Sequence, residues 1–297
     1  MSDWISMLSM PLIQNMFIAT TVACVLCGVI GTYVVVKQMV SVTGGIAHTM
    51  FGGIGLAYYL ESVLLVSWFT PMDGALLFAV ISALVLSIPT ISRRLGQDSV
   101  IGVLWAAGMA IGVIFMNLVD YSVVTPRSYE SILFGDVLLV GQTDILLMVT
   151  VTVTISAIVL WFYRDLQLLT FDETHAKLTG INVNLMKTLL YLMVAITCVM
   201  ITNIVGIVLI IALMTIPAAM ANLFSSSLGE MMLSSIVLSI VFSLLGLILA
   251  INFDLPPGGT VTITITVAFL IAFVAKNLSE RHGKRTCTAT KKIEKIR

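Results

Sequence analysis

The residue whose chemistry stands out is His48, a histidine within a long apolar sequence. It lies in a run of small residues at 43–57, with glycine at positions 44, 45, 52, 53 and 55. An ionisable side chain in a membrane segment is a functional-site hypothesis by default, and neutral imidazole binds zinc and other first-row metals. The alternative is a histidine that donates to a backbone carbonyl where glycines let two helices pack closely. His48 is therefore a candidate metal ligand.

Few other side chains in or near the apolar segments could coordinate a metal ion. Asp136 lies in a short apolar piece at 132–140 and could supply a hard oxygen ligand or belong to an acidic funnel for cations. Cys24 and Cys27 share a helix face and would suit a soft metal, but no partner ligand is visible, so apolar packing is favoured. Asp136 is kept as a second residue of the metal path.

A proline marks the apolar segment 206–221. Pro217 removes one helical hydrogen bond and favours a kink, and a kinked helix could act as a gate. Proline kinks in membrane helices usually only shape packing, and Met214 in the same segment is also expected to pack against lipid or core. We keep Pro217 and Met214 as candidate gate residues.

The stretch 164–186 is the one sizeable polar segment between apolar ones. Within it, Thr170 is expected to cap a short helix that Gly180 ends. Two acidic residues would favour the positive end of that helix: Asp172 and Glu173. Such a helix suits docking into a cleft of a soluble partner, with a solvated loop as the alternative. Its expected apolar contacts are Phe171, Ala176 and Leu178.

A second candidate docking site is the turn at 254–259, near the end of the chain. Its prolines make it rigid and its glycines make it tight. A docking protein could recognise this turn on the external surface. The residues assigned to it are Asp254, Pro256 and Pro257.

Composition decides the fold class that must position these residues. Hydrophobic residues make up 59% of the 297 residues and charged residues 10%, which excludes a water-soluble fold. We expect an all-α, polytopic transmembrane helical bundle of nine crossings in a single domain, 1–297, or eight if the weak break at Asn203 is absent. The expected crossings lie near 16–36, 46–67, 73–91, 99–119, 144–163, 187–202, 205–221, 231–251 and 260–276.

The distribution of basic residues predicts how these helices are oriented. The tail 277–297 is basic and is expected in the cytoplasm, as are the loops that contain Lys37, Arg93 and Arg164, which leaves the N-terminus outside. The first residues lack a basic region and a cleavage site, so no removable signal peptide is expected. The cysteines suggest no disulfide framework. The expected surrounding is the lipid bilayer, with no nucleic-acid partner.

The catalytic motifs that could suggest an enzyme are missing from the sequence. No phosphate-binding GxxxxGK[ST] loop, HExxH zinc motif or GxSxG nucleophile motif occurs. We therefore expect a chain that performs no hydrolysis and holds no permanently bound cofactor. Any energy source must belong to another protein.

Five stretches of the chain together resemble the metal-cation permeases of ABC importers, which take up zinc, manganese or iron. They are 31–48, 98–113, 133–140, 171–181 and 206–221, and the resemblance covers nearly the whole chain. It implies the type II importer permease fold, a homodimer, ATPase subunits on the cytoplasmic face and an extracytoplasmic metal-binding protein. The cargo would be a divalent metal ion, zinc or manganese or also iron, carried across a bacterial or archaeal plasma membrane.

The resemblance also implies roles for single residues. The segment 171–181 resembles the coupling helix, which transfers the closure of the ATPase to the membrane helices. Family members commonly carry an aspartate four residues before the membrane histidine, and Gly44 occupies that position here. The missing carboxylate is a hard ligand that suits manganese, so its loss weakly favours zinc, and Gly44 is kept as a pore residue. The implied coupling residues are Phe171, Asp172, Glu173, Ala176 and Gly180.

Two other functions are kept as alternatives. A permease for a metal chelate, such as a siderophore, haem or cobalamin, would use a similar scaffold, although such chains are usually longer. A stand-alone secondary carrier would couple a cation to a proton or sodium gradient. Such carriers usually place several charged groups in the middle of the membrane, and this chain has almost none.

Overall fold

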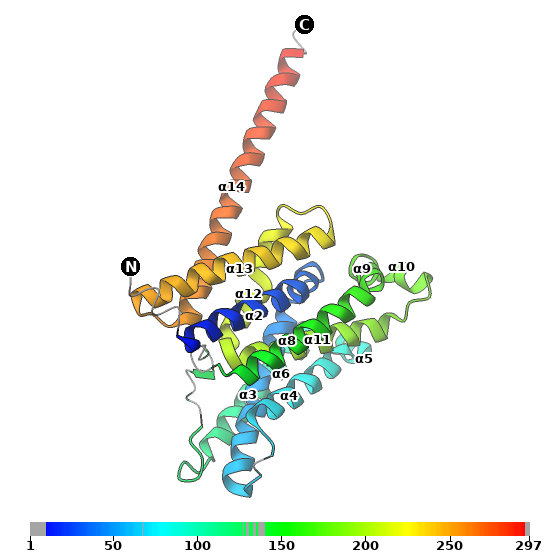
Figure 1. Ribbon diagram of the computed structural model, residues 1–297. Coiled ribbons are helices and arrows are strands. Elements are labelled where there is room, and N and C mark those ends of the chain that lie inside the picture. The colour runs from blue at the N-terminus through cyan, green and yellow to red at the C-terminus, as the bar shows by residue number, and fades with distance from the viewer. Residues whose placement is uncertain are drawn as a thin grey trace.

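The computed structural model describes residues 10–294 apart from 67, 127, 129–130, 133–134 and 136–139, and only the backbone of 92–93, 203–204 and 279–294. Asp136 and most of the apolar piece 132–140 therefore lie outside the described residues. The described part of the chain is helical and contains no strand (Figure 1). The all-α class predicted from the sequence is confirmed.

The described residues form twelve helices, which Figure 1 labels. In chain order they are α2 (Pro11–Val36), α3 (Val40–Leu64), α4 (Pro71–Ser87), α5 (Pro89–Leu95), α6 (Gln97–Asn117), α8 (Gln142–Trp161), α9 (Tyr163–Phe171), α10 (Glu173–Leu178), α11 (Val183–Val205), α12 (Ile207–Asn222), α13 (Leu228–Phe253) and α14 (Pro257–Glu294).

Seven of the described helices are long and apolar enough to cross a membrane: α2, α3, α6, α8, α11, α13 and the first part of α14, 257–278. Helices α4 and α12 are also apolar but shorter, with 17 and 16 residues. At 1.5 Å per residue these two helices are about 25 Å long, somewhat less than the hydrocarbon thickness. These nine helices correspond to the nine predicted segments, and the polytopic helical bundle is confirmed.

Two helix boundaries differ from the sequence-based prediction. The break expected at Asn203 lies instead at Gly206, whose φ of +81° interrupts the chain between α11 and α12. The single segment expected at 73–91 divides at Ile88, because Pro89 disfavours the helical conformation in the residue before it. The backbone conformations of glycine and proline therefore determine where these helices end, and hydropathy alone does not locate the ends.

Glycines bring α3 into backbone contact with α4 and α6. A Cβ atom added to Gly53 would lie 1.9 Å from the carbonyl oxygen of Gly74 on α4. One added to Gly55 would lie 2.7 Å from the carbonyl oxygen of Gly112 on α6. Neither position has room for a side chain, so α3, α4 and α6 form one closely packed group.

A second group contains α2, α12, α13 and α14. A Cβ atom on Gly31 of α2 would lie 2.1 Å from the carbonyl oxygen of Met214 on α12, and one on Gly28 would lie 2.8 Å from the Cα of Ile236 on α13. Helix α11 contacts both groups, whereas α2 and α3 contact each other little although three residues join them. The bundle is thus two tightly packed groups with α11 between them (Figure 1).

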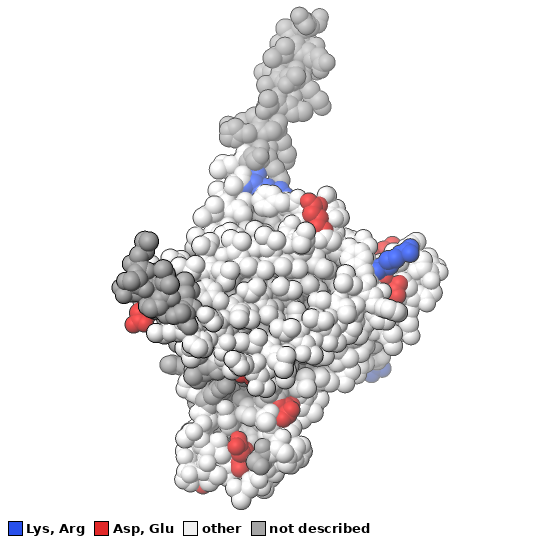
Figure 2. Space-filling model, in the orientation of Figure 1, with Lys and Arg blue, Asp and Glu red and all other residues white. Residues whose placement is uncertain are grey.

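The outer surface of the bundle is suited to lipid. On the face that Figure 2 shows, charged side chains lie toward the margins of the molecule and a broad uncharged area lies between them. Helix α8 contributes exposed aliphatic residues to the surface, among them Leu146, Val153 and Leu160, which are 68%, 63% and 71% exposed. Exposed apolar area of this extent is expected for helices that contact lipid chains.

Candidate functional site

His48 lies on α3 and its ring stacks on the indole of Trp105 from α6. The ring centroids are 4.1 Å apart and the planes differ by 11°. The ring is half-buried, and its Nδ1 atom is buried without a hydrogen-bond partner. Stacking therefore holds the imidazole, and Nδ1 does not make the hydrogen bond to a carbonyl that the packing alternative requires.

The contact between α3 and α6 is fixed beside this ring pair. The Thr49 hydroxyl lies 2.6 Å from the carbonyl oxygen of Gly45 and 3.1 Å from that of Leu104, so its proton can be donated across to α6. A Cβ atom on Gly108 would lie 2.5 Å from the Cα of Thr49. These close approaches leave α6 little freedom to slide along α3 next to His48.

Gly44 lies one helical turn before His48 and shares its neighbour. A Cβ atom on Gly44 would lie 3.7 Å from Cζ3 of Trp105 and 3.7 Å from Cδ1 of Ile211 on α12. The structure thus brings Gly44, His48 and Trp105 together. A small space between Trp105 and Ile211 lies where a longer side chain at position 44 would extend.

The other two candidate gate residues lie elsewhere. Met214 is fully buried, with its backbone packed against Gly31 of α2. Pro217 is buried within α12. Neither residue lines the two cavities described below.

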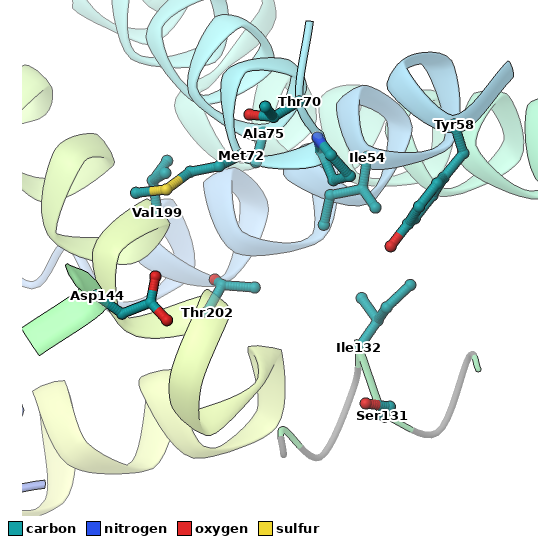
Figure 3. A pocket seen from close by; sticks show the side chains of 11 residues that line it. Ile54, Tyr58, Thr70, Met72, Ala75, Ser131, Ile132, Asp144, Val199 and Thr202 are labelled. Atoms are coloured by element: carbon teal, nitrogen blue, oxygen red, sulfur yellow. The ribbon is translucent and has the colours of Figure 1, made fainter. Parts of the chain in front are cut away.

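A cavity of about 300 Å³ lies near the C-terminal end of α3, and we call it the Tyr58 cavity (Figure 3). Ile54 and Tyr58 of α3 line it together with Thr202 of α11 and Asp144 of α8. One carboxylate oxygen of Asp144 accepts a 3.1 Å hydrogen bond from the backbone N–H of Gly141. The cavity therefore offers hydroxyl and carboxylate oxygens from three helices.

A second cavity, of about 250 Å³, lies at the N-terminal end of α3, and we call it the Lys37 cavity. Ser41 and Val42 of α3 line it with polar residues from α6, α10 and α11. Val42 and Ile54 are each six residues from His48, which corresponds to about 9 Å along the helix. His48 therefore lies midway along α3 between the two cavities.

The cap of α10 differs from the prediction. The carboxylate of Asp172 accepts hydrogen bonds from the backbone N–H groups of Thr174 and His175, at 2.8 and 3.0 Å, and the bond from His175 contributes most to lowering the Asp172 pKa. Thr170 is not the cap, because the chain is already helical there and its hydroxyl donates to the Leu166 carbonyl within α9. Gly180, with a φ of +86°, ends the segment as expected.

Glu173 joins three parts of the chain at the Lys37 cavity. Its two carboxylate oxygens lie 2.6 Å from the amino groups of Lys37, between α2 and α3, and Lys187 on α11. Burial alone would raise the pKa of Glu173, but hydrogen bonds from Lys187 and Lys37 outweigh it and the pKa is lowered. The first residue of α10 is thus ionised and paired with the C-terminal end of α2 and with α11.

The expected partner contacts on α9 and α10 are partly available at the surface. Phe171 and Leu178 are 64% and 81% exposed, whereas Ala176 is fully buried. Ala176 packs within this chain and cannot contact a docking protein directly. The second docking candidate is an exposed turn, in which Asp254 adopts a left-handed φ of +52° and Pro257 begins α14.

The described residues of a single chain contain no group of three or more His, Cys, Asp and Glu side chains that could hold a metal ion. Cys24, Cys27 and Cys198 are free and buried in the core. His48 therefore belongs to no such group within the described part of the chain.

The sequence comparison agrees with this architecture. The model of the ABC 3 transport family matches residues 9–276. This chain belongs to the ABC 3 transport family. The permease is 32% identical over 260 residues to the "Probable metal transport system membrane protein" of Chlamydia pneumoniae, with 88% of this chain and 87% of that protein covered. It is 29% identical over 267 residues to the manganese transport system membrane protein MntC of Halalkalibacterium halodurans, covering 90% and 88% of the two chains.

A solved structure shares the fold. The permease matches a chain of "PsaBC from Streptococcus pneumoniae in complex with Fab" with a TM-score of 0.79 and 27% identity, over 92% of this chain and 95% of that chain. The resemblance to the permeases of ABC importers is therefore confirmed.

Sequence reasoning missed several residues of this site in the permease. Trp105 lies 57 positions after His48 and is apolar, so no pattern connects the two. The ion pair between Lys37 and Glu173 spans 136 positions. Asp144 could have been noticed, because an acidic residue opens an otherwise apolar segment.

Proposed function

We propose that this permease forms the ion path of an ATP-driven importer for a divalent transition metal, zinc or manganese. The observation that carries the proposal is the placement of His48 midway along α3 between the Tyr58 and Lys37 cavities. Family membership and the names of the relatives in Chlamydia pneumoniae and Halalkalibacterium halodurans support a metal as the cargo. The metal passes through and is not a resident cofactor.

The orientation of the permease in the membrane follows from the charges beside the two ends of α3. Lys37 and Lys187 lie at one end, and positive residues are enriched on the cytoplasmic side of membrane proteins. We therefore place the Lys37 cavity and the C-terminus in the cytoplasm, and the Tyr58 cavity and the N-terminus outside the plasma membrane of a bacterium or archaeon. An incoming ion meets the oxygens of Asp144 and Tyr58 before it reaches His48.

A second copy of the permease completes the path in this proposal. Zinc is usually held by four ligands, and one chain offers a single imidazole at the middle of α3. The surface of α6 beside His48 is open, because Trp105 is 41% exposed and an added Cβ on Gly102 would meet nothing within 4 Å. A homodimer that brought two such surfaces together would supply two imidazoles, with water completing the coordination.

Energy enters through the segment 164–186. An ATPase subunit would contact the exposed side chains of Phe171 and Leu178, and its closure would move α9 and α10. The ion pairs of Glu173 connect that movement to Lys37, which caps the C-terminal end of α2 three residues before α3, and to Lys187 on α11. An extracytoplasmic metal-binding protein would dock on the opposite side, at the turn of Asp254, Pro256 and Pro257.

Reconstitution tests this function. The permease is placed in vesicles with its ATPase and its binding protein, and ATP hydrolysis and uptake are measured with zinc, manganese and ferrous iron in turn. We expect ATP-dependent uptake of zinc or manganese that stimulates hydrolysis. Uptake of a ferric siderophore would favour the chelate alternative, and uptake by the permease alone under an ion gradient would favour the secondary carrier.

A further inference from the structure

We propose that Trp105 is a positioning and specificity-determining residue of the metal path, which holds the His48 imidazole and favours zinc over manganese. The inference rests on the proposed role of His48 as a metal ligand. Trp105 makes the closest ring contact to His48, with centroids 4.1 Å apart and planes within 11°. This geometry covers one whole face of the imidazole with an apolar surface.

The stacking contact fixes the orientation of the imidazole, which at a metal-ligating histidine is usually done by a hydrogen bond. Such histidines almost always donate their second ring N–H to a carboxylate, carbonyl or water, which fixes the orientation of the ring. The Nδ1 atom of His48 is buried and has no such partner. Parallel contact with Trp105 is therefore the interaction that restrains rotation of the imidazole.

Trp105 is itself held in place by the backbone of α6. The residue before it, Leu104, accepts a hydrogen bond from the Thr49 hydroxyl on α3. One turn further on, Gly108 approaches the Cα of Thr49 so closely that a Cβ would lie 2.5 Å away. Since both contacts join α6 to the turn of α3 that carries His48, the backbone of Trp105 cannot shift without displacing α3.

The indole also limits which ligands can surround the ion. A second ligand one helical turn from His48 would come from position 44. An added Cβ on Gly44 would lie 3.7 Å from both Trp105 and Ile211, so apolar side chains flank that position. Zinc accepts imidazole and a four-coordinate arrangement, whereas manganese prefers six oxygen ligands. A ligand shell crowded by the indole therefore disfavours manganese more than zinc.

The first test compares Trp105→Ala with Trp105→Phe in the reconstituted importer, with zinc and manganese uptake measured separately. Aromatic contacts of this kind correspond to about a two- to tenfold change in an equilibrium. We expect Trp105→Ala to lower the ratio of zinc to manganese uptake by that amount, and Trp105→Phe to keep most of the ratio. Trp161→Ala is the matched control, because Trp161 is 84% exposed at the far end of α8.

The second test introduces a carboxylate beside the histidine. Gly44→Asp alone is expected to reduce uptake of both metals, because its side chain must enter the space between Trp105 and Ile211. The double variant Gly44→Asp, Trp105→Ala should regain uptake with manganese preferred. Independent, additive effects of the two changes would contradict the contact between them.

A third measurement does not depend on transport. In the purified full chain with Trp4, Trp68 and Trp161 changed to Phe, Trp105 is the single remaining tryptophan and the source of tryptophan fluorescence. Titration with zinc alone should change its emission with saturation, and His48→Ala should abolish the change. No saturable change would overturn the inference, as would an unaltered uptake ratio in Trp105→Ala while His48 remains essential. If His48→Ala transports normally, it is the proposed function that fails first.

Discussion

Glu173 is the residue through which α10 is attached to the membrane helices. Its carboxylate is 2.6 Å from the amino groups of both Lys37 and Lys187, and all three side chains are at least partly exposed to solvent. Partly exposed ion pairs contribute at most about 1 kcal/mol each to the free energy of unfolding. Their main effect is therefore to position α10 against the membrane helices. They give α10 a defined contact with Lys37 at the C-terminal end of α2, seven residues before Gly44 and eleven before His48.

We expect Glu173→Gln to uncouple ATP hydrolysis from uptake more than it destabilises the fold. The amide cannot pair with two lysines, so the free energy of unfolding should fall by no more than about 1 to 2 kcal/mol. Metal uptake per ATP hydrolysed should fall severalfold, because movement of α10 no longer reaches Lys37. The measurement is the uptake-to-hydrolysis ratio, with Glu61→Gln at the other end of α3 as the control.

The pH dependence of the same variant follows from the pKa of Glu173. The lysines lower this pKa in the folded chain, so the ionised side chain stabilises the fold at pH values above the unfolded pKa of about 4.3, and this stabilisation is lost as the pH falls through the lower folded value. The difference in melting temperature between the wild type and Glu173→Gln should therefore be constant from about pH 5.5 to 7.5 and shrink below about pH 4. A difference that grows on acidification would contradict the ion pairs.

At the scale of elements, glycines decide how closely the helices around His48 pack. Gly53→Ala would place a Cβ atom 1.9 Å from the Gly74 carbonyl oxygen and should lower stability by about 1 to 3 kcal/mol or more. Gly259→Ala on α14 is the matched control, since nothing lies within 4 Å and helix propensity favours alanine by up to about 1 kcal/mol. Thermal unfolding of the two variants should change in opposite directions.

The apolar helices could be predicted because each requires a long hydrophobic stretch, which hydropathy detects directly. Their ends could not, since the break at Gly206 depends on one backbone angle and the division at Ile88 depends on the following proline. The sequence favours Thr170 as the cap of α10, but α9 continues as far as Phe171 and leaves Asp172 as the first non-helical residue. Hydropathy does not show such local ends, because they depend on the backbone conformation of single residues.

At the scale of the whole molecule, the site lies where two packed helix groups meet. His48 belongs to the group of α3, α4 and α6, while Ile211, which flanks the space beside Gly44, belongs to the group of α2 and α12. A relative movement of the groups would therefore change the surroundings of His48. His48 and Gly44 could be singled out from the sequence, but Trp105 and the cavities arise from contacts between distant segments.

The central claim is that the cargo passes His48, and zinc uptake by the reconstituted importer with His48→Ala tests it most directly. Loss of a residue that only supports a metal ligand usually lowers metal affinity or activity about tenfold or more. We therefore expect zinc uptake to fall by at least about tenfold when the ligand itself is removed. His282→Ala, the same change in the C-terminal tail, should leave uptake unchanged. Uptake within about twofold of wild type in an intact His48→Ala complex would contradict the claim, because removal of a ligand in the path has a larger effect.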